Sequence, residues 1–413
     1  FVTASNGKTY FYNNYRKTKG WANVGGALYY LGDDFAMVRG WHADSTGTYY
    51  LSDQTGQALV GIQNIGGKNY YFGANGAMQT GVLNIDNKLY YFNPQDGAMV
   101  SGWVATASGQ KYYFSQNGPA LIGMNQVGNA WYCFGNDGLT VTGFQNVGGT
   151  WYFFDPTTGA RLHGFQTINN KLYCFDGQTG AMKTGWFTVG TTDSDKPVRY
   201  YADATGVVLT GLQTIGQATY LLTPAMARGF QNVNGGAMYF DEDSGVLHKG
   251  WFSVRNANAS QGDKDRDKDY YADQNGYILS GLQNIGGQYY YLEGNGKVKG
   301  GVKVLNGKKY FFDTSTAALQ YGWLELYDGD SGVREFHGAT DAKYTDATET
   351  QFSDSYHTAF ALSDGSWVVN SVITIGTDNY AFDQKGYLVR NGEIKINNVK
   401  YVTDKNGIAT RVH

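Results

Sequence analysis

The sequence has 413 residues, with 58 glycines, 34 tyrosines, only 5 prolines and 16% charged residues. Low charge with 16% aromatic residues excludes a disordered chain, and few prolines without a three-residue period exclude collagen. A net charge of −3 with scattered basic residues argues against a nucleic-acid partner. No apolar run is long enough to predict a transmembrane segment. The composition therefore predicts a turn-rich all-β protein.

In chain order, a short phrase that opens with glycine and a hydrophobic residue returns every 20 or 21 residues over most of the sequence. Such a period is typical of repeat architectures. The repeats are predicted to open at Gly20, Gly40, Gly61, Gly81, Gly102, Gly123, Gly143, Gly164, Gly185, Gly211, Gly229, Gly250, Gly281, Gly301 and Gly322.

Each repeat has the pattern of a β-hairpin. In residues 61–80, Gly66-Gly67 separates two short β-prone runs, as in a tight turn that needs positive φ. The second run, residues 70–72, places its first and third rings on one face and its middle ring on the other. Because one hairpin is marginal in water, we expect stacked hairpins that share an aromatic core. The predicted fold is an all-β β-solenoid with repeats of about 20 residues.

Two kinds of repeat alternate, and the pattern then fails near the C-terminal end. Short repeats begin Gly-hydrophobe-Gln, whereas repeats that begin Gly-Trp are often lengthened, as in residues 185–210 and 250–280. The pattern is lost over 325–370 and resumes at 371–390 and 391–411. We therefore expect hairpin repeats over 1–324, an insertion or degenerate repeat over 325–370, and terminal repeats over 371–413.

No catalytic constellation is evident, and we expect neither enzyme activity, nor a cofactor, nor a metal site. The acidic residues lie mainly in turns and insertions rather than as a close pair on a rigid scaffold. Residues 263–269 alternate Asp with cations but lack the glycine and closing Glu of a calcium loop, so they are interpreted as a solvated loop. The six histidines show no metal spacing. Cys133 and Cys174 stand where sister repeats have Tyr or Phe; buried thiols are the favoured interpretation and a disulfide the minor one.

The phrases GFQNVGG, GLQNIGG, TYYLSDQTGQALVG and YYADATGVVLTG resemble the cell-wall and glucan-binding repeat superfamily. Over about nine-tenths of the chain the similarity is to glucan-binding domains (domain V) of glucansucrases, choline-binding surface proteins and the receptor-binding repeats of glucosylating toxins. The resemblance implies that sugars bind between consecutive repeats, through an aromatic residue, a Gln and often a Lys or Thr, above all where a long repeat meets a short one.

A neutral sugar offers an apolar face to an aromatic ring and hydroxyls to a carboxamide or an ammonium group. Three long-to-short junctions carry Gln, and the fourth carries Asn125 and is the weaker candidate. The predicted carbohydrate-binding residues are Tyr49, Tyr50, Gln63, Lys68, Tyr70, Gln145, Gln166, Lys171, Tyr200, Tyr201, Gln213, Tyr220, Tyr270, Tyr271, Gln283 and Tyr290.

The resemblance predicts a non-catalytic module that binds an α-glucan, another neutral polysaccharide or a cell-wall polymer through several weak pockets. The chain begins at Phe1, and we expect a piece of an extracellular or cell-wall-associated glucansucrase whose chemistry lies elsewhere. Two alternatives stay open: a choline or teichoic-acid anchor, and a carbohydrate-binding repeat region of a toxin or adhesin.

Overall fold

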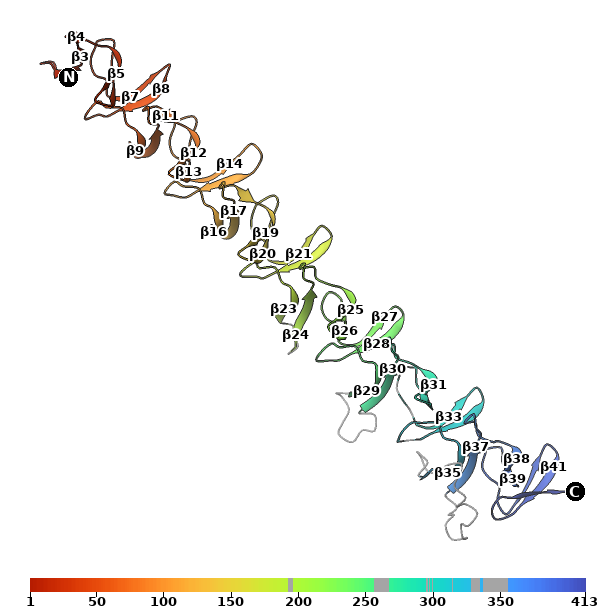
Figure 1. Ribbon diagram of the computed structural model, residues 1–413. Coiled ribbons are helices and arrows are strands. Elements are labelled where there is room, and N and C mark those ends of the chain that lie inside the picture. Colours follow the sequence, from red (N-terminus) through yellow and green to blue (C-terminus); the bar gives the residue numbers. More distant parts are fainter. Residues whose placement is uncertain are drawn as a thin grey trace. The chain divides into compact units, whose positions relative to one another are not determined.

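A computed structural model describes residues 1–191, 196–255, 267–294, 296, 298, 300–313, 315–327, 335, 336 and 356–413. The described residues form strands and turns with no α-helix. The chain divides into two compact units, unit 1 with residues 1–187 and 201–208, and unit 2 with residues 188–200 and 209–413 (Figure 1). The boundary runs through the hairpin of β23 (Gly185–Thr191) and β24 (Pro197–Ala202).

Unit 1 consists of consecutive antiparallel hairpins. Its strands are β1 (Val2–Thr3), β2 (Thr9–Tyr10), β3 (Tyr12–Asn13), β4 (Arg16–Lys17), β5 (Gly20–Val24), β6 (Ala27–Leu31), β7 (Gly40–Asp44), β8 (Gly47–Leu51), β9 (Gly61–Ile65), β10 (Lys68–Phe72), β11 (Met78–Gln79), β12 (Gly81–Ile85), β13 (Lys88–Phe92), β14 (Gly102–Ala105), β15 (Lys111–Phe114), β16 (Gly123–Val127), β17 (Ala130–Phe134), β18 (Thr140–Val141), β19 (Gly143–Val147), β20 (Thr150–Phe154), β21 (Gly164–Ile168) and β22 (Lys171–Phe175).

Unit 2 continues in the same way. Its strands are β25 (Gly211–Ile215), β26 (Ala218–Leu222), β27 (Gly229–Val233), β28 (Gly236–Phe240), β29 (Gly250–Arg255), β30 (Asp267–Ala272), β31 (Gly281–Ile285), β32 (Gln288–Leu292), β33 (Gly301–Leu305), β34 (Lys308–Phe312), β35 (Gly322–Tyr327), β36 (Glu335–Phe336), β37 (Tyr356–Ala361), β38 (Ser371–Ile375), β39 (Asp378–Phe382), β40 (Glu393–Ile396), β41 (Val399–Thr403) and β42 (Ala409–Val412).

The predicted repeat boundaries are confirmed. Every glycine expected to open a repeat, from Gly20 to Gly322, is the first residue of a strand. Within the hairpin of β9 and β10, Gly66 and Gly67 turn the chain at φ of 60° and 82°. The register then pairs Gly61 with Phe72, Ile62 with Tyr71 and Gln63 with Tyr70. The opening glycine Gly61 adopts a φ of 74°, which L side chains rarely take, and this explains why the repeat opens with glycine.

The core runs along the last residues of the second strands. Phe72, Phe92, Phe114, Phe154 and Phe240 are fully buried there. After each hairpin, the chain crosses back and bonds to two hairpins at once: Leu59 N donates to Tyr50 O of its own hairpin, and Ala58 N donates to Leu28 O of the preceding one. Neighbouring hairpins therefore share both backbone hydrogen bonds and the aromatic core, as a β-solenoid of stacked hairpins requires.

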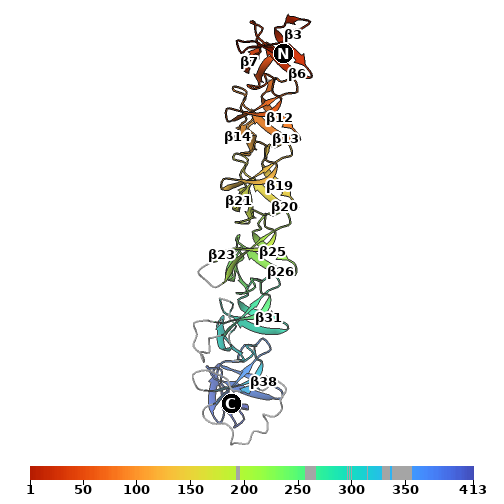
Figure 2. The ribbon, with the colours of Figure 1, turned by 90° about the vertical axis from the view of Figure 1, so that its left-hand side faces the viewer.

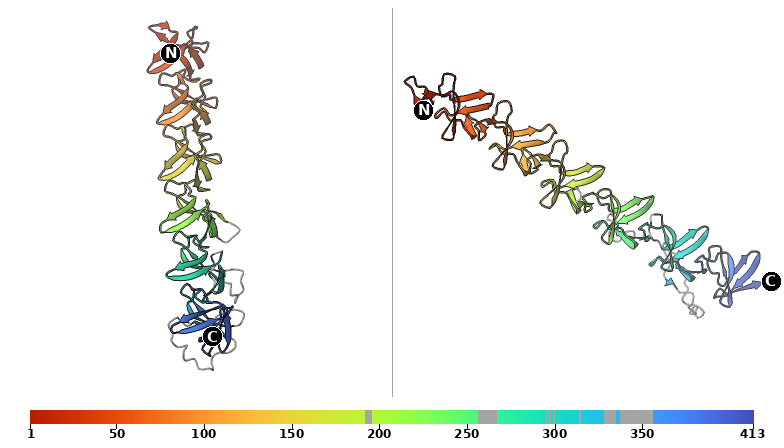
Figure 3. Two further views of the ribbon diagram at one scale, coloured as in Figure 1. Left: turned by 90° about the vertical axis from the view of Figure 1, so that its right-hand side faces the viewer. Right: turned by 45° about the horizontal axis from the view of Figure 1, so that its top comes forward.

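Hairpins in unit 1 point in recurring directions. In Figure 2, β7, β14 and β21 lie on one side of this unit, and the hairpins β12–β13 and β19–β20 lie on the other. The further views in Figure 3 show the same succession of hairpins within each unit. A given hairpin thus contacts its immediate neighbours, and the junction between two neighbours is where side chains from both can face one ligand.

The expected insertion over 325–370 is only partly described. Strand β35 pairs with β37 from Gly322 opposite Ala361 to Tyr327 opposite Tyr356, and with β36 at Leu324 and Glu325. The other residues between β35 and β37 lie outside the described part of the chain. The three-part domain division stays a prediction. Most of the charged segment 263–269 also lies outside the described residues; Asp267, Lys268 and Asp269 belong to β30.

Candidate functional site: the junctions between hairpins

Three rings meet where β7–β8 adjoins the next hairpin. Trp41 is the second residue of its hairpin and is 46% exposed. Its ring meets Tyr50 of the same hairpin edge to face, with centroids 5.1 Å apart, and Tyr70 of the next hairpin at 4.9 Å. We call such a set an aromatic box: the second residue of a hairpin, the penultimate residue of its second strand, and the ring two before the end of the next hairpin's second strand.

The same box recurs in both units. Trp103 lies 5.0 Å from Tyr113 and 4.8 Å from Tyr132 in unit 1. In unit 2, Trp251 lies 5.0 Å from Tyr271 and 4.9 Å from Tyr290, and Trp323 lies 5.1 Å from Phe360 and 5.0 Å from Tyr380. Trp103 and Trp251 are 40% and 43% exposed. The Trp41, Trp103 and Trp251 boxes therefore offer a half-exposed indole to solvent.

A glutamine stands beside several boxes, two residues after the opening glycine. Gln63 pairs in register with Tyr70, and Gln283 with Tyr290. Each carboxamide donates from Nε2 to the backbone carbonyl three residues earlier, Gln63 to Val60 O at 2.6 Å and Gln283 to Ser280 O at 2.6 Å. Asn125 makes the same bond to Ile122 O at 2.8 Å in the Trp103 box. The glutamine oxygens have no hydrogen-bond partner among the described residues, so each can accept one from a ligand.

The predicted tyrosine pairs are separated by the pleat of their strand. Tyr50 and Tyr271 join the box that follows them, together with Tyr70 and Tyr290. Tyr49 and Tyr270 face the other way, are buried, and meet Trp21 and Phe230 of the preceding hairpin at 4.3 and 5.1 Å. The structure thus brings together one tyrosine of each pair with the junctional glutamine.

The Tyr50 hydroxyl is held by a neighbouring turn. It donates to Asp53 Oδ2 at 2.5 Å, and this hydrogen bond to the carboxylate raises the pKa of Tyr50. The bond fixes one wall of the Trp41 box in place.

The third predicted junction is divided between the units. Tyr201 belongs to unit 1, where its ring lies 5.2 Å from Trp186. Tyr200, Gln213 and Tyr220 belong to unit 2, where Gln213 pairs with Tyr220 and donates to Thr210 O at 2.7 Å. Each half repeats the local geometry of the other junctions.

The two predicted lysines differ in their surroundings. Lys68 Nζ lies 3.2 Å from Asp96 Oδ2 in the turn of the next repeat. Lys171 is exposed. Gln166 pairs with Tyr173 and donates to His163 O at 2.8 Å, beside a box walled by phenylalanine, in which Phe144 lies 5.1 Å from Tyr173. Lys68 therefore links two repeats, in addition to any contact with a ligand.

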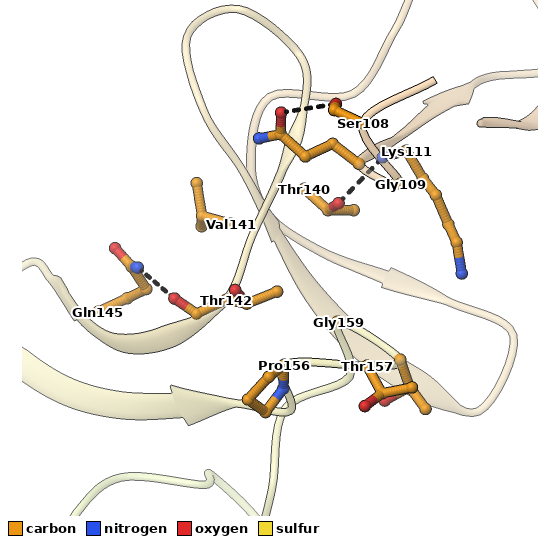
Figure 4. A pocket seen from close by; sticks show the side chains of 12 residues that line it. Ser108, Gly109, Lys111, Thr140, Val141, Thr142, Gln145, Pro156, Thr157 and Gly159 are labelled. Atoms are coloured by element: carbon orange, nitrogen blue, oxygen red, sulfur yellow. Dashed lines mark hydrogen bonds between the residues drawn. The ribbon is translucent and has the colours of Figure 1, made fainter. Parts of the chain in front are cut away.

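Gln145 lines a polar pocket of about 490 Å³ in unit 1 (Figure 4). Three segments form the pocket: the turn between β14 and β15, the segment around β18, and the turn after β20. Gln145 donates to Thr142 O at 2.8 Å, and Thr140 Oγ1 accepts from Lys111 N at 3.2 Å. The lining residues are Ser108, Gly109, Gln110, Lys111, Thr140, Val141, Thr142, Gln145, Pro156, Thr157, Thr158 and Gly159. Hydroxyl, amide and ammonium groups suit ligand hydroxyls, but no aromatic ring lines this pocket.

Sequence reasoning missed the tryptophans. Trp41, Trp103 and Trp251 form the exposed wall of their boxes, although only tyrosines, glutamines and lysines were predicted as contacts. The signal was present, because a Gly-Trp phrase opens every long repeat before a junctional Gln or Asn. Binding by any of these residues stays a prediction.

The described part of the chain bears on three further features: metal-ligand groups, membrane-spanning helices and the two cysteines. No group of three or more His, Cys, Asp or Glu is placed to hold a metal ion there, and that part of the chain has no helix that could cross a membrane. Cys133 and Cys174 are free and buried, which matches the favoured interpretation. Burial raises the pKa of both thiols, so they are held as thiols rather than reactive thiolates.

Comparison with known families identifies the repeats. Residues 59–102 and 80–121 match the model described as "Choline-binding repeat", and residues 142–157 and 280–298 match the "Putative cell wall binding repeat". The first model matches stretches of unit 1, and the second matches one stretch in each unit. The expected resemblance to this superfamily is confirmed.

Relatives include both glucosyltransferases and choline-binding proteins. Glucosyltransferase-S of Streptococcus mutans is 30% identical over 202 residues, which cover 47% of this chain and 13% of that protein. The alternansucrase solved in complex with isomaltononaose is 25% identical over 70% of this chain and 22% of that one, with a TM-score of 0.25. Choline binding protein F of Streptococcus pneumoniae, solved with a peptidoglycan analogue, is 24% identical over 68% and 98%, with a TM-score of 0.37.

Proposed function

We propose that this chain is a non-catalytic module that binds a neutral polysaccharide of the α-glucan class through several weak sites. The observation that carries the proposal is the repeated box of a half-exposed tryptophan, two tyrosines and a glutamine oxygen that is open to a ligand. The indole and phenol rings provide flat partners for the apolar face of a pyranose ring. The carboxamide accepts a hydrogen bond from a hydroxyl at the rim of the same ring.

The similarity to Glucosyltransferase-S supports an α-glucan as the ligand, because that relative is named as a glucosyltransferase. The proposed parent is an extracellular enzyme of that kind, whose catalytic part is separate from these repeats. The module would keep the polymer close to the enzyme. The polar pocket beside Gln145 adds a second kind of contact, through hydroxyl and ammonium groups rather than rings.

Several weak sites on one chain match a repetitive ligand. Once one box holds a glucan chain, the next contact is intramolecular, and the avidity exceeds single-site affinity by roughly 10²–10⁴. The test is electrophoresis in gels that contain dextran. Retardation is expected for the unaltered chain, and it should fall strongly for Gln213→Ala combined with Gln283→Ala. Migration that dextran does not change would reject the proposal.

A second candidate is binding of a quaternary ammonium group, as in choline. Three rings set nearly at right angles, with interplanar angles of 83° and 74° around Trp41, suit a cation held by cation–π contacts. The match to the choline-binding repeat over residues 59–121 favours the same candidate. Elution from dextran and choline resins separates the two: retention on the choline resin alone would replace the glucan proposal.

A further inference from the structure

The residue two after the opening glycine differs between junctions. At the Trp41 and Trp251 boxes this residue is Gln63 or Gln283, whose amide is drawn onto the carbonyl three residues earlier. At three of the boxes that precede a Gly-Trp repeat it is an aromatic residue instead: His42, Phe187 or Phe252. All three lie in equivalent places, at the third position of β7, β23 and β29.

Phe252 fills the slot between the two tyrosines of its box. Its ring stacks on Tyr239 with centroids 5.1 Å apart and planes 15° apart, and on Tyr270 at 5.5 Å and 17°. Phe252 itself is buried. The outer wall of this box, Phe230, stays 46% exposed, so Phe252 occupies the space between the rings rather than the rim.

His42 takes the same position in the Trp21 box. This box is formed by Trp21, Tyr30 and Tyr49, with Trp21 5.0 Å from Tyr30 and 4.3 Å from Tyr49. The His42 imidazole lies 3.7 Å from Tyr30 and 5.6 Å from Trp21, centroid to centroid. Its side chain is 15% exposed. The imidazole thus packs against two of the three rings of this box.

Polar contacts secure the Trp21 box around the imidazole. Trp21 Nε1 donates to Asp44 Oδ2 at 2.8 Å, and His42 Nε2 lies 3.5 Å from that oxygen. The Thr46 hydroxyl and amide hydrogen-bond to the other Asp44 oxygen and lower the pKa of this carboxyl. His42 Nε2 is buried without a hydrogen bond. Ring packing against Tyr30 and the nearby Asp44 carboxylate hold the imidazole in the box.

From these contacts we propose that the residue two after the opening glycine decides whether a junction can take a ligand. Gln or Asn leaves the box open, whereas His42 and Phe252 occupy the box with the chain's own ring. The Trp41 and Trp251 boxes are then open to a ligand, and the Trp21 and Phe230 boxes are closed. The inference rests on the proposed function and adds which junctions serve it.

The test follows individual tryptophans by fluorine NMR in the full chain labelled with 5-fluorotryptophan. Resonances of Trp21, Trp41 and Trp251 are assigned with single Trp→Phe variants, and isomaltotriose is titrated as the probe. In the unaltered chain, the Trp41 and Trp251 resonances should move and the Trp21 resonance should stay. In His42→Gln, the Trp21 resonance should begin to move, with an affinity within about tenfold of the Trp41 site.

The reciprocal variant is Gln63→Phe, which should leave the Trp41 resonance unmoved while that of Trp251 still shifts. Gln283→Phe should do the reverse, and it serves as a second variant if one of them fails to fold. The proposed role of His42 is overturned if the Trp21 resonance moves in the unaltered chain. It is also overturned if the Trp21 resonance stays still in His42→Gln while the Trp41 resonance moves. If no tryptophan responds in any variant, the glucan proposal itself is overturned.

Discussion

Trp251 and Tyr290 come from consecutive hairpins and meet edge to face, with ring centroids 4.9 Å apart and planes 69° apart. The contact serves two purposes. It packs one repeat against the next, and it leaves the indole 43% exposed beside the Gln283 carboxamide. The same rings therefore serve both ligand binding and the packing of consecutive hairpins.

Replacing Trp251 with Ala should weaken binding to short α-glucans by roughly tenfold at this site, because an aromatic contact contributes about 0.5–1.5 kcal/mol beyond its buried area. Trp251→Phe should keep part of the affinity, since the variant retains an aromatic ring at this position. Titration calorimetry with isomaltotriose measures both. Equal affinity of the Ala variant and the unaltered chain would show that Trp251 does not contribute to binding.

Affinity should rise steeply with glucan length. A trisaccharide reaches one box, whereas dextran can engage several boxes of one unit, so the apparent dissociation constant should fall by roughly 10²–10⁴ between them. Affinity electrophoresis against fractions of graded length measures the trend. Similar affinities for short and polymeric ligands would indicate a single working site.

Gly245→Ala should destabilise unit 2 more than Gly216→Ala. Both glycines have positive φ, 73° and 66°, so either alanine incurs backbone strain of about 1–2 kcal/mol. A Cβ at Gly245 would also lie 2.5 Å from Met226 Sδ, whereas nothing lies within 4 Å at Gly216. Overpacking adds about 1–3 kcal/mol. Thermal unfolding followed by circular dichroism compares the two, and equal losses would argue against the close contact.

Stability should fall between about pH 4 and pH 2. The Ser244 amide and hydroxyl donate to Asp241 Oδ1 at 2.7 and 2.8 Å, and they lower the pKa of this carboxyl from 3.8 to about 2. The folded protein therefore favours the ionised form of Asp241 over the protonated form. The stabilisation that this carboxylate provides is complete above the pKa that Asp241 has in the unfolded chain. It is lost as the pH falls through the lower pKa that Asp241 has in the folded protein.

The matched variant is Asp241→Asn, which removes this carboxylate. Its melting temperature should lie below that of the unaltered chain at pH 6, and the gap should narrow by pH 2.5. Other turn carboxylates with lowered pKa values, such as Asp155 and Asp313, contribute a common background to both proteins. A gap that stays constant with pH would contradict the assignment.

The hairpins could be predicted from the sequence because their signals are local. The opening glycines and turns such as Gly66-Gly67 fix each strand's start and register without reference to distant residues. The core phenylalanines follow from the same register, since Phe72 must face Gly61.

The membership of each box could not be predicted from local signals. It depends on how one hairpin is offset from the next, and the pleat sends Tyr49 and Tyr50 to different boxes. The sequence predicted that both tyrosines lie near Gln63, but only Tyr50 contacts Trp41, whereas Tyr49 contacts Trp21. The filled boxes were missed for the same reason, because nothing near His42 in the sequence places it against Tyr30.

The backbone bond from Ala58 N to Leu28 O, and its counterpart from Met99 N to Asn69 O, join each hairpin only to the one before it. Nothing in this scheme fixes a total length. A gene that duplicates or deletes one long and one short repeat together would recreate the same contacts at the new seam. The number of places available to a polymer could therefore change in whole steps during evolution, without any redesign of the fold.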